Sequence, residues 1–182
     1  DLGAIISSSL TTGSGDDSVY VTAVQYRSNT LDMGDGNDFA SLSRIAGTIN
    51  MGAGNDILEA RDTSNGFLYI SSPTINMGTG DDIVRTSSTI NTSASIDGDS
   101  DFDTLQFVNR DSKAITTTIS MISNFEKIDI TGTLNNSVTI RGTDVEKNHS
   151  ATATVDASGT SHNNVLIVDG DADDKVTLSG IS

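Results

Sequence analysis

Four copies of one short motif place an aspartate at the end of a glycine-rich loop. The copies read TGSGDD, MGDGND, MGAGND and MGTGDD. Glycines at the second and fourth positions allow positive φ values that turn main-chain carbonyls to one side, and the closing aspartate adds charged oxygens. Calcium, a hard cation, takes about six to eight oxygens of these two kinds. The candidate ligands are Gly13, Gly15, Asp17, Gly34, Gly36, Asp38, Gly52, Gly54, Asp56, Gly78, Gly80 and Asp82.

Two degenerate copies follow. GDSDFD (98–103) carries Asp99 and Asp101 at the two glycine positions. We expect this loop to cap the row at a cost in backbone strain, because no further calcium loop follows it directly. Its candidate ligands are Asp97, Asp99, Asp101 and Asp103. DGDADD (169–174) stands alone, and it is either a metal site or a solvated turn. Its candidate ligands are Asp169, Asp171 and Asp174.

Apolar residues flank each loop at fixed distances. One stands two positions before the loop, and another stands two positions after the closing aspartate. This pattern predicts strand, turn, strand, with the same inward positions stacked copy over copy. The residues before the loops are Leu10, Leu31, Ile49, Ile75, Ile96 and Ile167. The residues after them are Val19, Ala40, Leu58, Val84, Leu105 and Val176.

The spacing of the closing aspartates predicts the length of a coil. Successive intervals are 21, 18, 26 and 21 residues, which we interpret as a common unit of about 18 residues, or two nonapeptides. The expected fold is all-β: a right-handed parallel β-solenoid (β-roll) with calcium loops stacked on one edge. Loops about 4.8 Å apart would share each ion, so five loops would hold about four ions. The opposite edge would absorb the insertions. The largest, within 61–73, is either a surface hairpin or a ligand-contacting loop.

Composition favours the same chemistry. Of 25 acidic residues, 22 are Asp, which prefers turns and caps to helix interiors. A net charge of -15 argues against nucleic acid and anionic lipid as partners and favours bound calcium ions. No cysteine is present, which excludes disulfides and thiolate sites, and His149 and His162 stand alone in polar stretches.

The ends and the apolar runs of the chain bear on its setting. No apolar run reaches the roughly 18 residues of a membrane span. The chain starts with Asp1-Leu2-Gly3 and has no leader, so we expect an excised fragment.

Two regions are expected. Residues 1–108 form the calcium-binding solenoid. The motif then disappears, although the 71 residues between Asp103 and Asp174 match about four coils. Short β-rich stretches separated by Gly, Asn and Ser leave two alternatives for residues 109–182. They continue the solenoid without regular calcium loops, or they form a small β-domain.

The loops resemble the GGxGxDxUx nonapeptide of the RTX (repeats-in-toxin) proteins, a calcium-binding β-helix repeat. The match covers 11–107, and four residues replace the family's first glycine: Thr12, Met33, Met51 and Met77. The phrases IDGDSDFDTLQF, ISNFEKIDITG and NVLIVDGDADDKVTLSG are also similar to the C-terminal part of large bacterial RTX adhesins. This resemblance implies type I secretion, an extracellular or cell-surface location, folding on calcium outside the cell, neighbouring domains in a longer chain, and attachment in biofilms. The residues do not identify the adhesion target.

Three functions follow as hypotheses. The first is a calcium-folded structural module of a secreted adhesin. The second is an RTX tail that serves the secretion and folding of an enzyme such as a protease or lipase. The chain itself is not expected to be an enzyme, because it has neither HExxH nor G-x-S-x-G. The third is a sugar- or ice-binding solenoid with Ser/Thr rows, suggested by Thr116–Thr118 and by Thr152 with Thr154. The unequal intervals argue against ordered rows.

Overall fold

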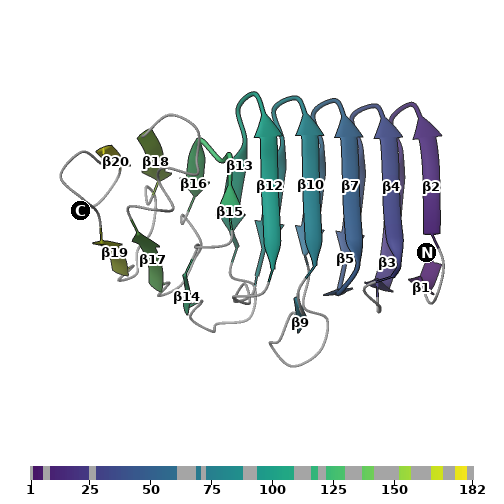
Figure 1. Ribbon diagram of the computed structural model, residues 1–182, viewed down its shortest axis with the longest axis horizontal. Coiled ribbons are helices and arrows are strands. Elements are labelled where there is room, and N and C mark those ends of the chain that lie inside the picture. Colours follow the sequence, from purple (N-terminus) through teal and green to yellow (C-terminus); the bar gives the residue numbers. More distant parts are fainter. Residues whose placement is uncertain are drawn as a thin grey trace.

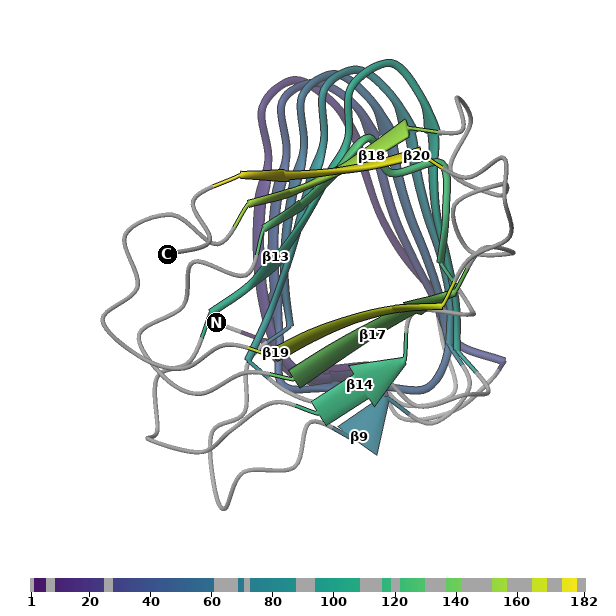
Figure 2. The ribbon, with the colours of Figure 1, turned by 90° about the vertical axis from the view of Figure 1, so that its left-hand side faces the viewer.

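The computed structural model describes residues 2–5, 9–24, 28–60, 69–70, 73–87, 94–108, 116–118, 122–129, 137–141, 152–156, 165–169 and 175–179. Within these ranges every regular element is a β-strand, and the strands pair in parallel. The chain winds coil after coil along one axis (Figure 1), and each coil encloses a common interior (Figure 2). The prediction of an all-β parallel solenoid is confirmed.

Two sheets form the long walls of the solenoid. The entry sheet holds the strands that lead into the loops: β2 (Ser9–Ser14), β4 (Thr30–Asp35), β7 (Thr48–Ala53), β10 (Thr74–Thr79), β12 (Ser95–Ser100) and β15 (Ile122–Ser123). The exit sheet holds the strands that follow: β3 (Ser18–Val24), β5 (Phe39–Leu42), β8 (Ile57–Ala60), β11 (Ile83–Thr86), β13 (Thr104–Phe107) and β16 (Lys127–Asp129). It also includes β1 (Leu2–Ile5), β6 (Arg44–Ile45), β9 (Tyr69–Ile70), β18 (Thr152–Asp156) and β20 (Lys175–Ser179).

The strand register corrects the expected coil length. A coil contains about 21 residues on average, not 18. The strands stay in register because the extra residues lie between the end of an exit strand and the start of the next entry strand. The expectation that unequal intervals prevent ordered rows is therefore wrong. One outward row of hydroxyl residues crosses the entry sheet in register: Ser9, Thr30, Thr48, Thr74 and Ser95.

The core consists of stacked columns of apolar side chains. The predicted sixth members of the two columns on either side of the loops are wrong, because Ile167 pairs with Thr139 in a separate sheet and Val176 pairs with Ala153, whereas Val155 is the residue that pairs with Ile128. The other predicted residues of the two columns pair position by position, from Leu10 to Ile96 and from Val19 to Leu105, and the next coil adds Ile122 and Ile128. Their members are buried, apart from the partly buried Leu10. A third column consists of Met33, Met51 and Met77, which are fully buried. The methionines at the first loop position thus fill the interior beneath the loops, where a flexible thioether adapts to irregular space.

Polar side chains also connect the exit strands. The Arg85 guanidinium donates to Gln106 Oε1 (2.6 Å) and to Glu59 Oε1 (3.3 Å). The Gln106 amide in turn donates to Asp129 Oδ2 at 3.0 Å. This row joins β8, β11, β13 and β16 across the sheet, so these four neighbouring coils are also connected away from the loops.

After Val108 the described strands continue to pair in parallel. In the exit sheet, β16 pairs with β18 and β18 with β20. A third sheet contains β14 (Thr116–Thr118), β17 (Ser137–Arg141) and β19 (Val165–Asp169). Thr116–Thr118 and Thr152–Thr154 lie in different sheets, so they do not form one row. The division of the chain at residue 108 stays a prediction.

The insertion within 61–73 is described only at its end. Tyr69–Ile70 forms β9, which pairs in parallel with Arg44–Ile45 of β6. The expected turn at Asn65-Gly66 lies outside the described residues. In the part of the chain that the structure describes, no helix is long and apolar enough to cross a membrane.

Candidate functional site

Five loops stack along one edge of the solenoid, which we call the loop edge. They connect entry strands to exit strands and form the row of turns seen in Figures 1 and 2. Corresponding positions face each other from coil to coil, as in the pairing of Gly13 with Gly34 and of Gly52 with Gly78. Loops 1 to 5 are residues 12–17, 33–38, 51–56, 77–82 and 98–103. The sequence motif thus places equivalent groups in files, one strand spacing apart.

The closing aspartates form a hydrogen-bonded ladder along this edge. From Asp38 onward, each carboxylate accepts a hydrogen bond from the main-chain N–H of the closing aspartate one coil earlier. The N···Oδ1 distances are 2.7 Å from Asp17 to Asp38, 2.7 Å from Asp38 to Asp56, 2.7 Å from Asp56 to Asp82 and 2.9 Å from Asp82 to Asp103. The ladder therefore orients each carboxylate through only one of its two oxygens.

The second oxygen of each closing aspartate is buried without a hydrogen-bond partner among the described residues. This holds for Oδ2 of all five: Asp17, Asp38, Asp56, Asp82 and Asp103. Asp56, Asp82 and Asp103 are fully buried. A buried charged oxygen with no partner costs several kcal/mol, so such atoms are rare in native structures unless a proton or cation meets them. Five in one file require a common explanation.

The protonation behaviour of the ladder agrees with its burial. Burial raises the pKa of Asp56 to about 6, of Asp82 to about 7 and of Asp103 to about 8. The hydrogen bond from the preceding aspartate opposes this increase, and the neighbouring carboxylates add to it. The pKa of Asp38 is raised for the same reasons. Without a cation, Asp103 therefore keeps its proton near neutral pH, and Asp82 is partly protonated there.

Main-chain oxygens of the loops face the neighbouring coils. The carbonyl oxygen of Gly34 is aimed at the α-carbon of Gly52 so closely that a methyl group on Gly52 would collide with it. Gly52 has a φ of 111°, which only glycine adopts readily. The same close approach recurs at both glycine positions of loops 2 to 4, so the three spaces between loops 1 and 4 each have carbonyl oxygens on one side.

These donors fit calcium better than a softer metal. Among the described residues, no three acidic or histidine side chains converge on one point. A cation here would therefore combine the unpartnered carboxylate oxygens with loop carbonyls, which is the mixed oxygen set of calcium. Zinc would need histidine or cysteine. The ligand residues named from the sequence remain predictions as metal ligands.

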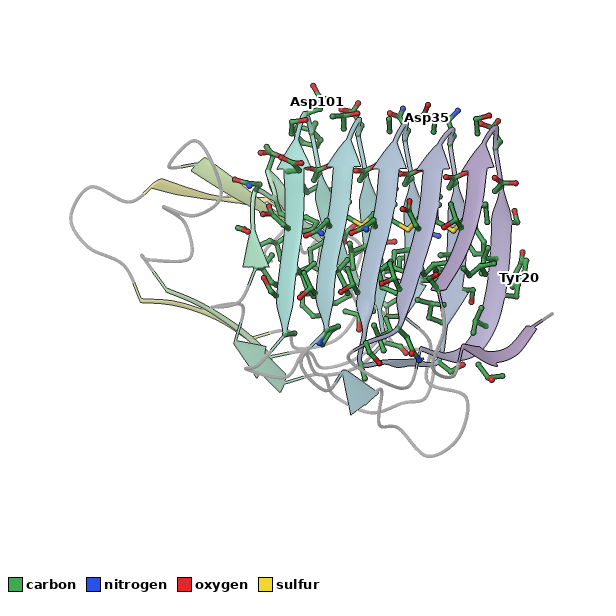
Figure 3. The ribbon with its side chains drawn as sticks, turned by 45° about the vertical axis from the view of Figure 1, so that its right-hand side comes forward. Tyr20, Asp35 and Asp101 are labelled. Atoms are coloured by element: carbon green, nitrogen blue, oxygen red, sulfur yellow. The ribbon has the colours of Figure 1, made fainter. Side chains whose placement is uncertain are left out.

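The fifth loop keeps the loop conformation without glycine. Asp99 and Asp101 have φ values of 75° and 83°, the left-handed region expected at a cost in strain. Asp101 Oδ2 accepts a hydrogen bond from the N–H of Gly80 at 3.2 Å, at a position where the earlier loops use a main-chain carbonyl. In Figure 3 the side chains of Asp35 and Asp101 stand at the outer rim of the loop edge.

A second ladder at this edge was not predicted. Side-chain oxygens at the fifth loop position accept hydrogen bonds from the N–H of the following coil, opposite in direction to the closing ladder. The distances are 2.7 Å for Asn37 to Asp16, 2.9 Å for Asn55 to Asn37, 2.9 Å for Asp81 to Asn55 and 3.0 Å for Phe102 to Asp81. The recurrence of Asp or Asn before the closing aspartate in loops 1 to 4 was the available signal. Phe102 ends this ladder because its side chain has no acceptor.

Glu126 is a further residue that the sequence reasoning missed. It extends the closing ladder by one coil, because the N–H of Asp103 donates to Glu126 Oε2 at 2.8 Å. The turn that contains Glu126 lacks the loop motif, so the alignment of repeats did not include it.

The sixth motif cannot be placed as a site. Asp171 and Asp174 lie outside the described residues, and Asp169 ends β19, which belongs to the third sheet rather than the entry sheet.

Comparisons with family models, curated proteins and solved structures found no match for this chain.

Proposed function

We propose that this chain is a calcium-binding structural module whose solenoid becomes stable when calcium occupies the loop edge. The observation that carries the proposal is the file of buried Oδ2 atoms with no partner among the described residues. Calcium between adjacent loops would meet these oxygens together with glycine carbonyls of the same loops. The module itself performs no catalysis under this proposal.

The energetic argument rests on burial and charge. Without a cation, the folded chain must either protonate its inner carboxylates or bury their charge, and both cost free energy. A divalent cation bound to the carboxylates removes both costs. A site filled at about a hundredfold above its dissociation constant adds roughly 2.7 kcal/mol if the unfolded chain does not bind. The combined contribution of a few such sites is comparable to the net stability of an ordinary domain, about 5 to 15 kcal/mol. Calcium would then act as a folding switch.

The direct test is calorimetric titration of the metal-free chain with calcium, with far-UV circular dichroism recorded before and after. We expect binding of about four ions between the five loops and an increase in β signal. Magnesium is the control ion, because it demands tighter octahedral geometry and releases its water reluctantly. An unchanged spectrum with no heat of binding would refute the proposal.

The cellular setting rests on the resemblance of the loops to RTX repeats. We place the module in a secreted RTX adhesin at the cell surface or outside the cell, supporting surface or biofilm attachment together with neighbouring domains. The alternative is an RTX tail of a secreted enzyme, in which the solenoid aids secretion and folding of that neighbour. The sequence that flanks this segment distinguishes them: an adhesin would have long tandem domains, and an enzyme would have a catalytic domain.

The outward hydroxyl row on the entry sheet favours a second candidate. Ser9, Thr30, Thr48, Thr74 and Ser95 are partly or fully exposed and in register. A regular row of hydroxyls one strand apart suits a sugar or an ice surface. Binding to a glycan array or to ice that disappears on replacing Thr48 and Thr74 by Val would support it. If neither assay detects binding, this second candidate is refuted and only the structural module stands.

A further inference from the structure

The coil after the fifth loop makes a shortened turn at the loop edge. Nine positions separate Ile96 from Leu105, but only six separate Ile122 from Ile128. Ile96 pairs with Ile122 in the entry sheet, and Leu105 pairs with Ile128 in the exit sheet. The turn at 123–127 therefore covers the same span with three fewer residues. The shortened turn therefore needs a longer side chain to reach the closing ladder.

Glu126 occupies the closing position in this shortened turn. The pairing of Lys127 with Thr104 puts Glu126 level with Asp103. Its Oε2 accepts from the N–H of Asp103 at 2.8 Å, just as Asp103 Oδ1 accepts from the N–H of Asp82 at 2.9 Å. The extra methylene of glutamate supplies the reach that the shorter backbone lacks.

The main-chain oxygen of Asn124 in this turn and Oδ2 of Asp103 converge beside Gly98. Gly98 stands where Met33, Met51 and Met77 send side chains into the core. A methyl group on Gly98 would collide with the main-chain oxygen of Asn124 and lie 2.5 Å from Asp103 Oδ2. Carbonyl and carboxylate oxygens thus replace a methionine side chain at the end of the column.

These groups are held in place. Asp103 is fully buried, and its Oδ2 has no hydrogen-bond partner in the described ranges. Asn124 has a φ of 57°, and its side-chain amide donates to Asp97 Oδ1 at 2.7 Å, which ties the short turn to the fifth loop. The carbonyl of Asn124 is therefore fixed toward Gly98.

We propose that Asp103, Glu126 and the main-chain oxygen of Asn124 form a terminal calcium site, distinct from the sites between glycine loops. The proposal rests on the calcium-binding function proposed above and adds one ion to the row. Its donors are two carboxylates and a carbonyl, a hard oxygen set that suits calcium, with water completing the shell. With this site, the row of glycine loops can end at Asp103 while the carboxylate of Asp103 still meets a cation.

The test compares calcium stoichiometry in the full chain and in matched variants, by calorimetry and by equilibrium dialysis. We expect the parent chain to bind one ion more than Glu126→Gln. The control Asp35→Asn removes the same charge from an exposed loop position and should bind as many ions as the parent. Gly98→Ala is the second variant. Its added methyl group faces both oxygens, and it should lose the same single ion while its β spectrum in calcium stays that of the parent.

The outcomes separate the two proposals. Calcium binding by the parent with an unchanged stoichiometry in Glu126→Gln and Gly98→Ala would overturn the terminal site alone. No calcium binding by the parent would overturn the proposed function and the terminal site with it. Loss of one ion in both variants, with none lost in Asp35→Asn, would support the assignment.

Discussion

The closing ladder predicts that the metal-free solenoid loses stability as the pH rises. An aspartate in an unfolded chain has a pKa near 3.8, whereas the folded ladder raises the pKa of Asp56 to about 6 and of Asp103 to about 8. Between these values the folded chain binds more protons than the unfolded chain. The free energy of unfolding must therefore fall as the pH increases through this window.

The magnitude follows from the pKa values. For Asp56 alone, an increase from 3.8 to about 6 corresponds to about 3 kcal/mol at a pH above both values. Asp82 and Asp103 have larger increases from the same cause. Their combined penalty is comparable to the whole net stability of a typical domain, about 5 to 15 kcal/mol. We therefore expect the metal-free fold to persist at mildly acidic pH and to be lost above the pKa of Asp103.

The assay is urea unfolding followed by far-UV circular dichroism, across a pH series that spans the window from 3.8 to about 8. In metal-free buffer the midpoint should decrease with pH. In saturating calcium it should increase over the same range, because the ion binds the deprotonated carboxylates. Asp82→Asn is the matched variant: it keeps a side-chain acceptor in the ladder and should flatten the metal-free slope. A metal-free midpoint that is constant or increases with pH would refute the reasoning.

Three further predictions concern single positions. Asp56→Asn should weaken the two calcium sites on either side of loop 3, measured by calorimetry, whereas Asp35→Asn at the exposed rim should not. Gly52→Ala should lower the thermal midpoint in calcium, because φ is 111° and the new methyl group would collide with the carbonyl of Gly34. The left-handed conformation alone costs about 1 to 2 kcal/mol, so an unchanged midpoint would contradict the stacking. Met51→Ala, at a fully buried position, should destabilise the fold by about 2 to 5 kcal/mol in urea unfolding while leaving the calcium stoichiometry intact.

The wall strands and the loop edge could be predicted because the repeat carries its own register. Leu31 and Ile49 stand at the same distance from their loops and pair with each other, so the coil that buries one also buries the other, and neither strand can shift by one residue. The length of the coil could not be predicted in this way. The closing aspartates mark only one corner of each coil, whereas the extra residues enter at another. A coil length of two nonapeptides therefore left out the segments between exit and entry strands, whose varying length does not disturb strand pairing.

The direction of the two side-chain ladders also lay beyond the sequence. Asp or Asn at the fifth and sixth loop positions indicates acceptors, but their partners are N–H groups one coil away. Asp38 accepts from the coil before it, whereas Asn37, its neighbour in sequence, offers its oxygen to the coil after it. Opposite directions at adjacent positions arise because successive side chains point to different sides of the backbone. Only the stacked coils determine which N–H each oxygen meets.

Glu126 helps explain why the chain uses aspartate almost everywhere else. In the full-length loops the short arm of Asp56 or Asp82 brings Oδ1 to 2.7 Å from the N–H of the preceding closing aspartate and keeps Oδ2 buried beside the loop. A glutamate there would carry its carboxylate past that position. Where the turn is three residues shorter, the longer arm restores the contact with Asp103. The use of Asp at the five closing positions and of Glu at position 126 thus follows from the length of the turn. Glu126→Asp should accordingly fail to replace glutamate at this one position, even though aspartate is the right residue at the five before it.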